Sequence, residues 1–356
     1  MPPFRITRLD SKELLEKHSG SIIGLWDRNL ENIWPGRFDW LYFGNPAGSA
    51  VTYLAEDIAS GRPVGATTIF PRKVLLGDRK ATIGIAVDFA VEAQYRTFGP
   101  VLQLHRAIIS DIGKAGYEFV FACPNQAAKG VFLRAGYRPI GELKVLTRLV
   151  RVDDQIKKRI RNRFLSLLCC ACGNAILRFM DAASFQSVRR PVYVREIGSF
   201  DERCDRLWER VRDRRKVELV NDSGYLNWRY VRCKTFAYRI LGVFEKKTGD
   251  LKGYLVYSVN NSLAKVWDIC FEGGQGVLAA LMTGFARMML RQNTQRIIIH
   301  YLGDDVFERR VRKLNFFGMD TPLTCMVAVS PEHADAYREV ASQQDRWTVF
   351  RGNSNL

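Results

Sequence analysis

The segment Phe38-Asp39-Trp40-Leu41-Tyr42 in the first half of the chain is similar to Leu226-Asn227-Trp228-Arg229-Tyr230 in the second half. A strand-like segment follows in each half, and then a turn that leads to a glycine, Gly65 or Gly253. Each glycine comes 25 residues after the tryptophan of its half. Self-similarity of this kind predicts two similar folding units within one chain.

The same order of elements is expected in both halves, namely β-β-β-α-β-α. The strands that carry this pattern lie at 51–56, 83–88 and 118–122 and at 238–245, 266–268 and 296–301, and the helices lie at 99–115 and 127–136 and at 277–292 and 305–318. Such an order predicts a mixed sheet covered by helices in each unit. We therefore expect an α+β (α/β) protein with a first domain at 1–150, a basic helical linker at 151–195 and a second domain at 196–356.

Composition excludes several classes of protein. The chain has 356 residues, of which 47% are hydrophobic and 26% charged, so it is neither disordered nor fibrous. Its 54 Lys and Arg exceed its 37 Asp and Glu by 17, which favours polyanionic partners. Four histidines without a recognisable metal-ligand spacing predict that no metal is bound. Eight irregularly spaced cysteines, and an N-terminus without an apolar run, predict reduced thiols and a cytoplasmic location.

Two motifs in the first half resemble those of the GNAT superfamily of acyl-CoA-dependent N-acyltransferases. Arg96-Thr97-Phe98-Gly99-Pro100-Val101 follows a strand ending at Val91 and resembles the superfamily's pyrophosphate loop, Q/R-x-x-G-x-G/A. The segment 125–137, from Asn125 to Gly136-Tyr137, resembles its final helix. A loop at a helix N-terminus presents free N–H groups and the positive end of the helix dipole to a phosphate. The resemblance covers residues 35–145 and implies an N-acetyltransferase-like fold and activity.

The resemblance implies a set of residues that bind acyl-CoA: Val91, Arg96, Thr97, Phe98, Gly99, Val101, Leu102 and Asn125. Three departures from the superfamily pattern bear on this site. Pro100 has no N–H, Val101 replaces a small residue, and Phe132 stands where the superfamily often has a tyrosine that protonates the leaving thiolate. Tyr137 or a water molecule would then supply that proton.

Attack by an amine requires a general base near the end of the strand before the loop, and Asp88 and Glu92 fit that position. Asp88 could instead be a structural acid, since Asp268 recurs in the second half, and Asn125 could instead cap its helix. The second half has Glu272-Gly273-Gly274-Gln275-Gly276 in place of the loop, without the arginine. We expect no comparable site there and assign the second domain to the acceptor.

The middle of the chain joins a basic run, 157–163, to the apolar stretch 164–172. This stretch is too short to span a bilayer, and the polar residues Asn174 and Arg178 interrupt the sequence after it. A linker helix packed between the two units is one interpretation. Peripheral contact of residues 151–180 with the anionic inner leaflet of a membrane is the other.

The leading hypothesis is an acyl-CoA-dependent N-acyltransferase, in particular an N-acetyltransferase. A duplicated unit with one surviving loop resembles acyltransferases of bacterial polysaccharide biosynthesis, which implies an amine acceptor such as an amino sugar or glycan precursor. One alternative is a Fem-like or aminoacyl-lipid transferase that uses aminoacyl-tRNA, although those enzymes generally lack the loop around Arg96, so nucleic acid is not the favoured partner. The other is an inactive module that binds acyl-CoA, motivated by Pro100 and Phe132.

Overall fold

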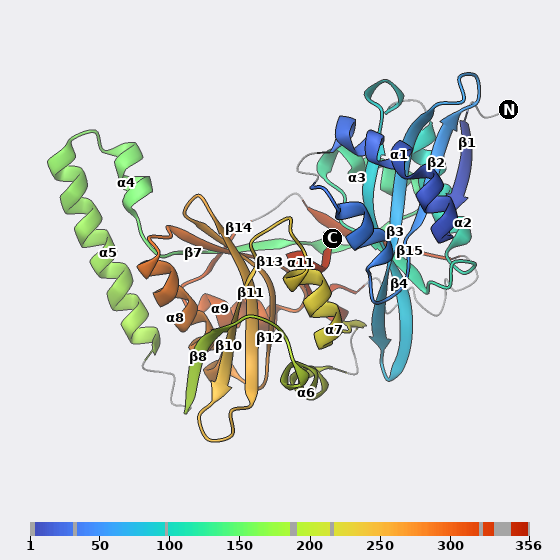
Figure 1. Ribbon diagram of the computed structural model, residues 1–356. Coiled ribbons are helices and arrows are strands. Elements are labelled where there is room, and N and C mark those ends of the chain that lie inside the picture. Colours follow the sequence, from blue (N-terminus) through green and yellow to red (C-terminus); the bar gives the residue numbers. More distant parts are fainter. Residues whose placement is uncertain are drawn as a thin grey trace.

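The computed structural model describes residues 4–30, 34–96, 99–185, 191–213, 217–319, 323–330 and 343–354 (Figure 1). The elements of the first half are β1 (Phe4–Leu9), α1 (Lys12–Asn29), β2 (Val51–Asp57), β3 (Pro63–Leu76), β4 (Arg79–Val91), α2 (Pro100–Asp111), β5 (Phe119–Ala122), α3 (Gln126–Ala135), β6 (Arg138–Glu142) and β7 (Lys144–Leu149). Two helices follow, α4 (Asp153–Arg159) and α5 (Arg163–Phe185). The second half contains β8 (Val192–Ile197), α6 (Glu202–Val211), β9 (Val217–Leu219), α7 (Ser223–Leu226), β10 (Arg239–Glu245), β11 (Leu251–Asn260), β12 (Leu263–Phe271), α8 (Gln275–Arg291), β13 (Arg296–Leu302), α9 (Asp305–Arg312), β14 (Phe317–Met319), β15 (Thr324–Val329), β16 (Val349–Phe350) and α11 (Arg351–Ser354).

These elements form two mixed sheets with flanking helices, as predicted. The first sheet has the order β1-β2-β3-β4-β5-β15-β6, and the second has the order β14-β7-β13-β12-β11-β10-β8. In each sheet four antiparallel strands lead to one parallel pair, β4 with β5 or β12 with β13. A parallel pair needs a crossover connection, which α2 and α8 provide. We call the first sheet with its helices the first unit and the second sheet with its helices the second unit.

Each half of the chain contributes a strand to the interior of the sheet built by the other half. Strand β15, from the second half of the chain, lies between β5 and β6 of the first sheet, and β7, from the first half, lies between β13 and β14 of the second. A hairpin needs a turn of at least two residues, but only Leu143 separates β6 from β7, so the chain must run on into the other sheet. The expected domain boundary at residue 150 therefore does not coincide with the division between the two sheets, because β7 precedes residue 150 and belongs to the second sheet.

A symmetrical pair of tryptophans joins the two units. Trp40 and Trp228 lie in matching π-helical turns, Asp39–Phe43 and Asn227–Val231, and their rings stack with centroids 5.1 Å apart. Each indole N–H donates to the backbone carbonyl of the other tryptophan at 3.0 Å. The repeated sequence segment is therefore a packing element of the interface between the units.

A buried arginine adds a polar contact between the two halves of the chain. Arg72 of β3 donates to the carbonyl oxygen of Val220 and to Oδ1 of Asn221, both at 2.5 Å. Its guanidinium group lies 3.4 Å from the centroid of the Tyr225 ring. Strand β9, just before Val220, pairs with the end of β3, so the second half also adds a short strand to the first sheet.

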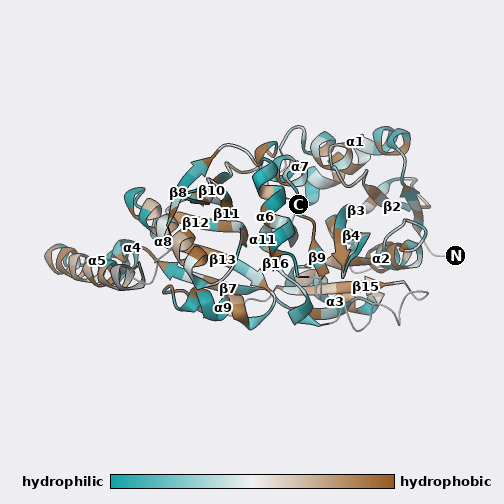
Figure 2. Ribbon diagram, turned by 90° about the horizontal axis from the view of Figure 1, so that it is seen from below, coloured by the Kyte–Doolittle hydropathy of each residue, from teal (hydrophilic) through white to brown (hydrophobic). Residues whose placement is uncertain are grey.

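Helices α4 and α5 lie on the side of the second unit that faces away from the first unit (Figure 2). Helix α5 contacts α4 and α8. The sequence interpretation that a linker helix packs between the two units is therefore wrong. The segment is helical, as expected, but it is attached to the outer edge of the second unit.

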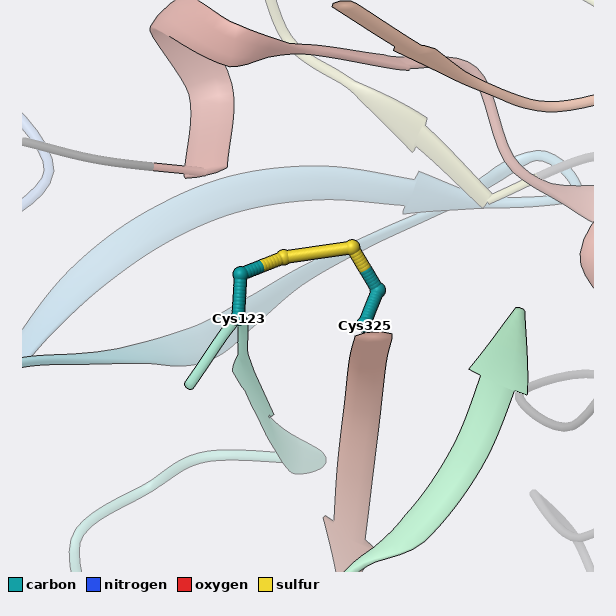
Figure 3. The surroundings of a disulfide bond; sticks show 2 residues. All are labelled: Cys123 and Cys325. Atoms are coloured by element: carbon teal, nitrogen blue, oxygen red, sulfur yellow. A yellow bond between two sulfur atoms is a disulfide. The ribbon is translucent and has the colours of Figure 1, made fainter. Parts of the chain in front are cut away.

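A disulfide ties the exchanged strand β15 to its neighbour β5 (Figure 3). Cys123 directly follows β5, and Cys325 lies opposite it in β15. The expectation of reduced thiols is thus wrong for this pair, because strand exchange brings together two cysteines that are 202 residues apart in the sequence. The other six cysteines are free.

Thiol titration of the denatured protein without reductant checks this pairing. We expect six thiols, since two of the eight cysteines are bonded. The variant Cys325→Ser should give seven, because Cys123 is released, whereas the control Cys172→Ser should give five. Eight thiols in the unmodified protein would contradict the disulfide.

Candidate functional site

The first unit opens where β4 and β5 part. These strands pair only at Gly84 with Val120 and Ile85 with Phe121, and β4 then continues to Val91 paired with β3 but not with β5. A bulge in β4 coincides with this divergence, because Ala66 pairs with Ala90 and Thr68 pairs with Val87. Two residues of β4, Asp88 and Phe89, therefore lie opposite a single residue of β3, Thr67. Within this bulge, Asp88 adopts a φ of 51°.

Asp88 forms a buried ion pair. Its Oδ1 accepts a hydrogen bond from Nη2 of Arg37 at 2.5 Å, and the two side chains are 3% and 10% exposed. Arg37 precedes the π-helical turn of Trp40, so the pair connects the bulge to the interface between the units. This arrangement matches the structural-acid interpretation of Asp88.

Removing one partner of a buried ion pair leaves the other charge uncompensated. We expect Asp88→Asn to lower the free energy of unfolding by about 3 kcal/mol. The exposed residue Asp10 offers a control, and Asp10→Asn should leave stability unchanged. Chemical denaturation of both variants gives the comparison, and equal stability of Asp88→Asn and the unmodified protein would refute a structural role.

The loop after β4 leads into α2 at a glycine. Gly99 is the N-cap of α2 with a φ of 94°, and Pro100 occupies the first helical position. Leu102 is half-buried and Val101 is buried, and both lie in the first turn, whose N–H groups have no partner within the helix. The side chain of Arg96 donates to the carbonyl of Val91 at 3.1 Å and to Oδ1 of Asn29 at 3.0 Å. Thr97 and Phe98, which were predicted to bind acyl-CoA, lie outside the described residues.

The remaining predicted residues take three different environments. Asn125 caps α3 by accepting from the N–H of Ala128 at 2.9 Å, as one of its two interpretations predicted. Glu92 pairs with Arg28 at 2.7 Å and borders an open cavity of 550 Å³. Tyr137 is buried, and burial raises the pKa of its hydroxyl.

An aromatic cluster fills the space beneath α2 and α3. The ring of His105 lies 4.0 Å from Phe132, 4.9 Å from Phe89 and 5.7 Å from Tyr137, between centroids. Burial lowers the pKa of His105 to about 3, so its imidazole stays neutral. Within the described residues, neither the His105 nitrogens nor the Tyr137 hydroxyl has a hydrogen-bond partner. His105 therefore packs in the core.

The second unit also opens between its parallel strands. Strands β12 and β13 pair only from Leu263 to Val266, and β12 bulges at Trp267, one residue before Asp268. A cavity of 380 Å³ lies beyond this point, and its lining includes Asp268, Phe271, Gly273 and Phe307. Glu218 and Leu219 of β9 also line it, so it borders the junction between the units. The expectation that no acyl-CoA site exists near Gly273 stays a prediction, because a cavity does not by itself make a phosphate site.

Asp268 differs from its counterpart Asp88. Its side chain is buried, and its Oδ2 accepts from the Tyr230 hydroxyl at 3.4 Å, whereas Oδ1 has no hydrogen-bond partner among the described residues. Burial raises the pKa of Asp268 to about 6, although the positive charges of Arg72 and Arg229 oppose that shift. No signal in the sequence identified this residue beyond its recurrence at the end of a strand.

The raised pKa of Asp268 predicts how stability depends on pH. The folded protein holds a proton on this carboxyl up to about pH 6, whereas the unfolded chain releases it near the usual value of 3.8. Its contribution to stability therefore falls between these pH values. We expect Asp268→Asn to raise the free energy of unfolding by about 2 kcal/mol at pH 7.5 and to change it little at pH 4.5. Denaturation at both pH values measures this, and a variant less stable at pH 7.5 would contradict the prediction.

Among the described residues, no group of three or more His, Cys, Asp or Glu side chains is placed to hold a metal ion. In the part of the chain that the structure describes, one helix, α5, is long and apolar enough to cross a membrane by length and composition.

Comparison with known proteins identifies the fold. No protein-family model matches the chain, and no curated protein matches it in sequence. A probable N-acyltransferase of unknown function from Enterococcus faecalis V583 matches with a TM-score of 0.64 and 12% identity, over 93% of this chain and 74% of its own. A GCN5-related N-acetyltransferase from Kribbella flavida matches with a TM-score of 0.60 and 13% identity, over 99% and 83% of the two chains. Another GCN5-related N-acetyltransferase, from Anabaena variabilis, matches with a TM-score of 0.58 and 10% identity, over 91% of this chain and 72% of its own. The chain therefore has the fold of the GCN5-related N-acetyltransferases, in a form with two units.

Proposed function

We propose that the protein transfers an acyl group from acyl-CoA to an amine, and that the first unit binds the acyl-CoA. The fold shared with N-acetyltransferases supports the reaction class. The observation that carries the assignment to the first unit is Gly99, a positive-φ glycine that is itself the N-cap of the helix after a splayed strand. In the second unit the positive-φ glycine, Gly273, precedes the N-cap Gly274 of α8. An amino sugar or glycan precursor is the proposed acceptor.

Gly99 suits a phosphate site for two reasons. Among the described residues outside its own chain neighbours, a Cβ atom there would meet none closer than 3.8 Å, so the glycine is needed for its backbone conformation rather than for lack of space. The 12 residues of α2 direct their helix dipole and first-turn N–H groups toward the same loop. Pro100 removes one donor from this set.

Calorimetry with acetyl-CoA tests the assignment. We expect the unmodified protein to bind acetyl-CoA and Gly99→Asp to bind it with an affinity that is lower by about tenfold or more. The carboxylate repels the phosphate, and a non-glycine residue is strained at this φ. Gly249→Asp is a matched control, since Gly249 also has a positive φ, 73°, and a Cβ atom there would meet nothing within 4 Å among the described residues beyond its chain neighbours. Equal affinity of the two variants would refute the phosphate site.

Glu92 is the proposed general base. It lies one residue after β4 and borders an open cavity, whereas Asp88 and Tyr137 are buried. We expect Glu92→Gln to lower turnover by about 100-fold and to leave acetyl-CoA affinity unchanged. Arg28→Gln removes the partner of Glu92 and serves as a comparison, with a smaller loss expected. Release of the CoA thiol in the presence of a panel of amino sugars measures turnover, and full activity of Glu92→Gln would remove it from this role.

The two alternatives give different results in the same experiments. Salt-sensitive binding of tRNA without binding of acetyl-CoA would favour an aminoacyl-tRNA-dependent transferase. Binding of acetyl-CoA without thiol release for any amine would favour an inactive binding module.

A further inference from the structure

Helix α5 has one packed face and one exposed apolar face. Ser166 and Cys170 are buried toward the second unit, and Gly173 approaches Val152 so closely that a Cβ atom would lie 2.7 Å from it. The opposite face is apolar and exposed, with Phe164 80%, Phe179 76%, Ile176 61%, Leu167 58% and Leu168 52% accessible. Only 11% of the segment Arg163–Met180 is buried. An exposed apolar surface of this size on one helix marks a contact surface.

Polar contacts hold the packed face of α5 against the molecule. The N–H of Val152 donates to Oδ1 of Asn174 at 3.0 Å, and Nδ2 of Asn174 donates to Oδ2 of Asp153 at 3.1 Å. Helix α8 contacts the same helix. Because α5 is fixed to the second unit along this side, lipid could not surround it as it surrounds a membrane-spanning helix, and only its outer face is available.

Basic side chains lie beside the apolar face. Lys157, Lys158 and Arg159 end α4, and Arg161 and Arg163 lead into α5. All five are exposed. Apolar side chains flanked by a cationic cluster are the combination that binds a helix in the plane of an anionic membrane surface.

We propose that α5 lies on an anionic lipid membrane, with its apolar face among the acyl chains and the basic residues of 157–163 at the headgroups. The charge favours lipid over a second copy of the chain, since a net charge of +17 opposes self-association, whereas an anionic surface neutralises it. This proposal is independent of the reaction proposed above.

Flotation of the full chain with lipid vesicles tests the proposal. We expect binding to phosphatidylcholine vesicles that contain phosphatidylglycerol and much weaker binding to phosphatidylcholine alone. Lys157→Glu/Lys158→Glu should weaken binding by about tenfold or more, whereas Lys246→Glu/Lys247→Glu, with the same change of charge in an exposed turn, should not. Phe164→Ser/Phe179→Ser should also release the protein, and Ile58→Ser, at another exposed apolar residue, should not.

Three results would overturn the proposal. Equal binding by the two charge-reversed proteins would show that the basic cluster has no part in it. Retained binding by Phe164→Ser/Phe179→Ser would exclude the apolar face. A dimer in sedimentation that dissociates in Phe164→Ser/Phe179→Ser, without vesicle binding, would assign the face to a second copy.

The cavity beside Asp268 carries a second inference. We infer that it binds a small ligand with a charged amine, because Asp268 lines it with a buried carboxylate whose Oδ1 has no partner among the described residues. Phe271 and Phe307 give the cavity apolar walls beside this charge. A cationic group there would compensate a buried carboxylate that otherwise costs stability.

Calorimetry with glucosamine and glucose tests this inference without acyl-CoA, so its outcome is separate from that of the proposed transfer reaction. We expect glucosamine to bind, glucose not to bind, and Asp268→Asn to lose at least about tenfold in glucosamine affinity. Asp10→Asn, at an exposed carboxylate of the first unit, should bind glucosamine normally. Equal affinities for the two sugars, no binding of glucosamine, or unchanged affinity of Asp268→Asn would each overturn it.

Discussion

A link of one residue governs the architecture of this protein. Leu143 is buried between β6 and β7, and its N–H donates to the carbonyl of Leu323 at 2.9 Å. Since the chain cannot turn back within one residue, β7 enters the second sheet, and β15 fills the corresponding place in the first. Each sheet is thus completed by the other half of the chain. The stacked Trp40 and Trp228 join the two units, and the Cys123–Cys325 disulfide ties the exchanged strand β15 to β5.

Much of this fold could be predicted because it is encoded locally. Periodic apolar residues and turn glycines placed β2, α2, β5, α8 and β13 close to their observed bounds. The strand exchange and the cysteine pairing could not be predicted in this way. Both depend on contacts between residues about 200 positions apart, such as Cys123 with Cys325, and no local pattern records them.

The same distinction between local and long-range contacts applies to the candidate sites. The loop around Gly99 was recognisable because its conformation is set by neighbouring residues. Arg37 as the partner of Asp88 could not be predicted, since the two side chains meet only after the segment before Trp40 packs over the bulge of β4. The cavity beside Asp268 was missed for a similar reason, because α6, β9 and α9 surround it only in the folded chain. Likewise, the sequence showed that 164–172 is apolar but not which face of α5 would remain exposed.

In each unit the parallel strands part before a helix, β4 from β5 and β12 from β13, and we assign acyl-CoA to the first of these two junctions. Hydrogen–deuterium exchange with and without acetyl-CoA compares the two junctions in one experiment. We expect acetyl-CoA to slow exchange in peptides covering 91–104, where the end of β4 leads into α2. Exchange in peptides covering 271–280, at the corresponding junction of β12 and α8, should not change. Slower exchange confined to 271–280, or no change in either segment, would contradict the assignment.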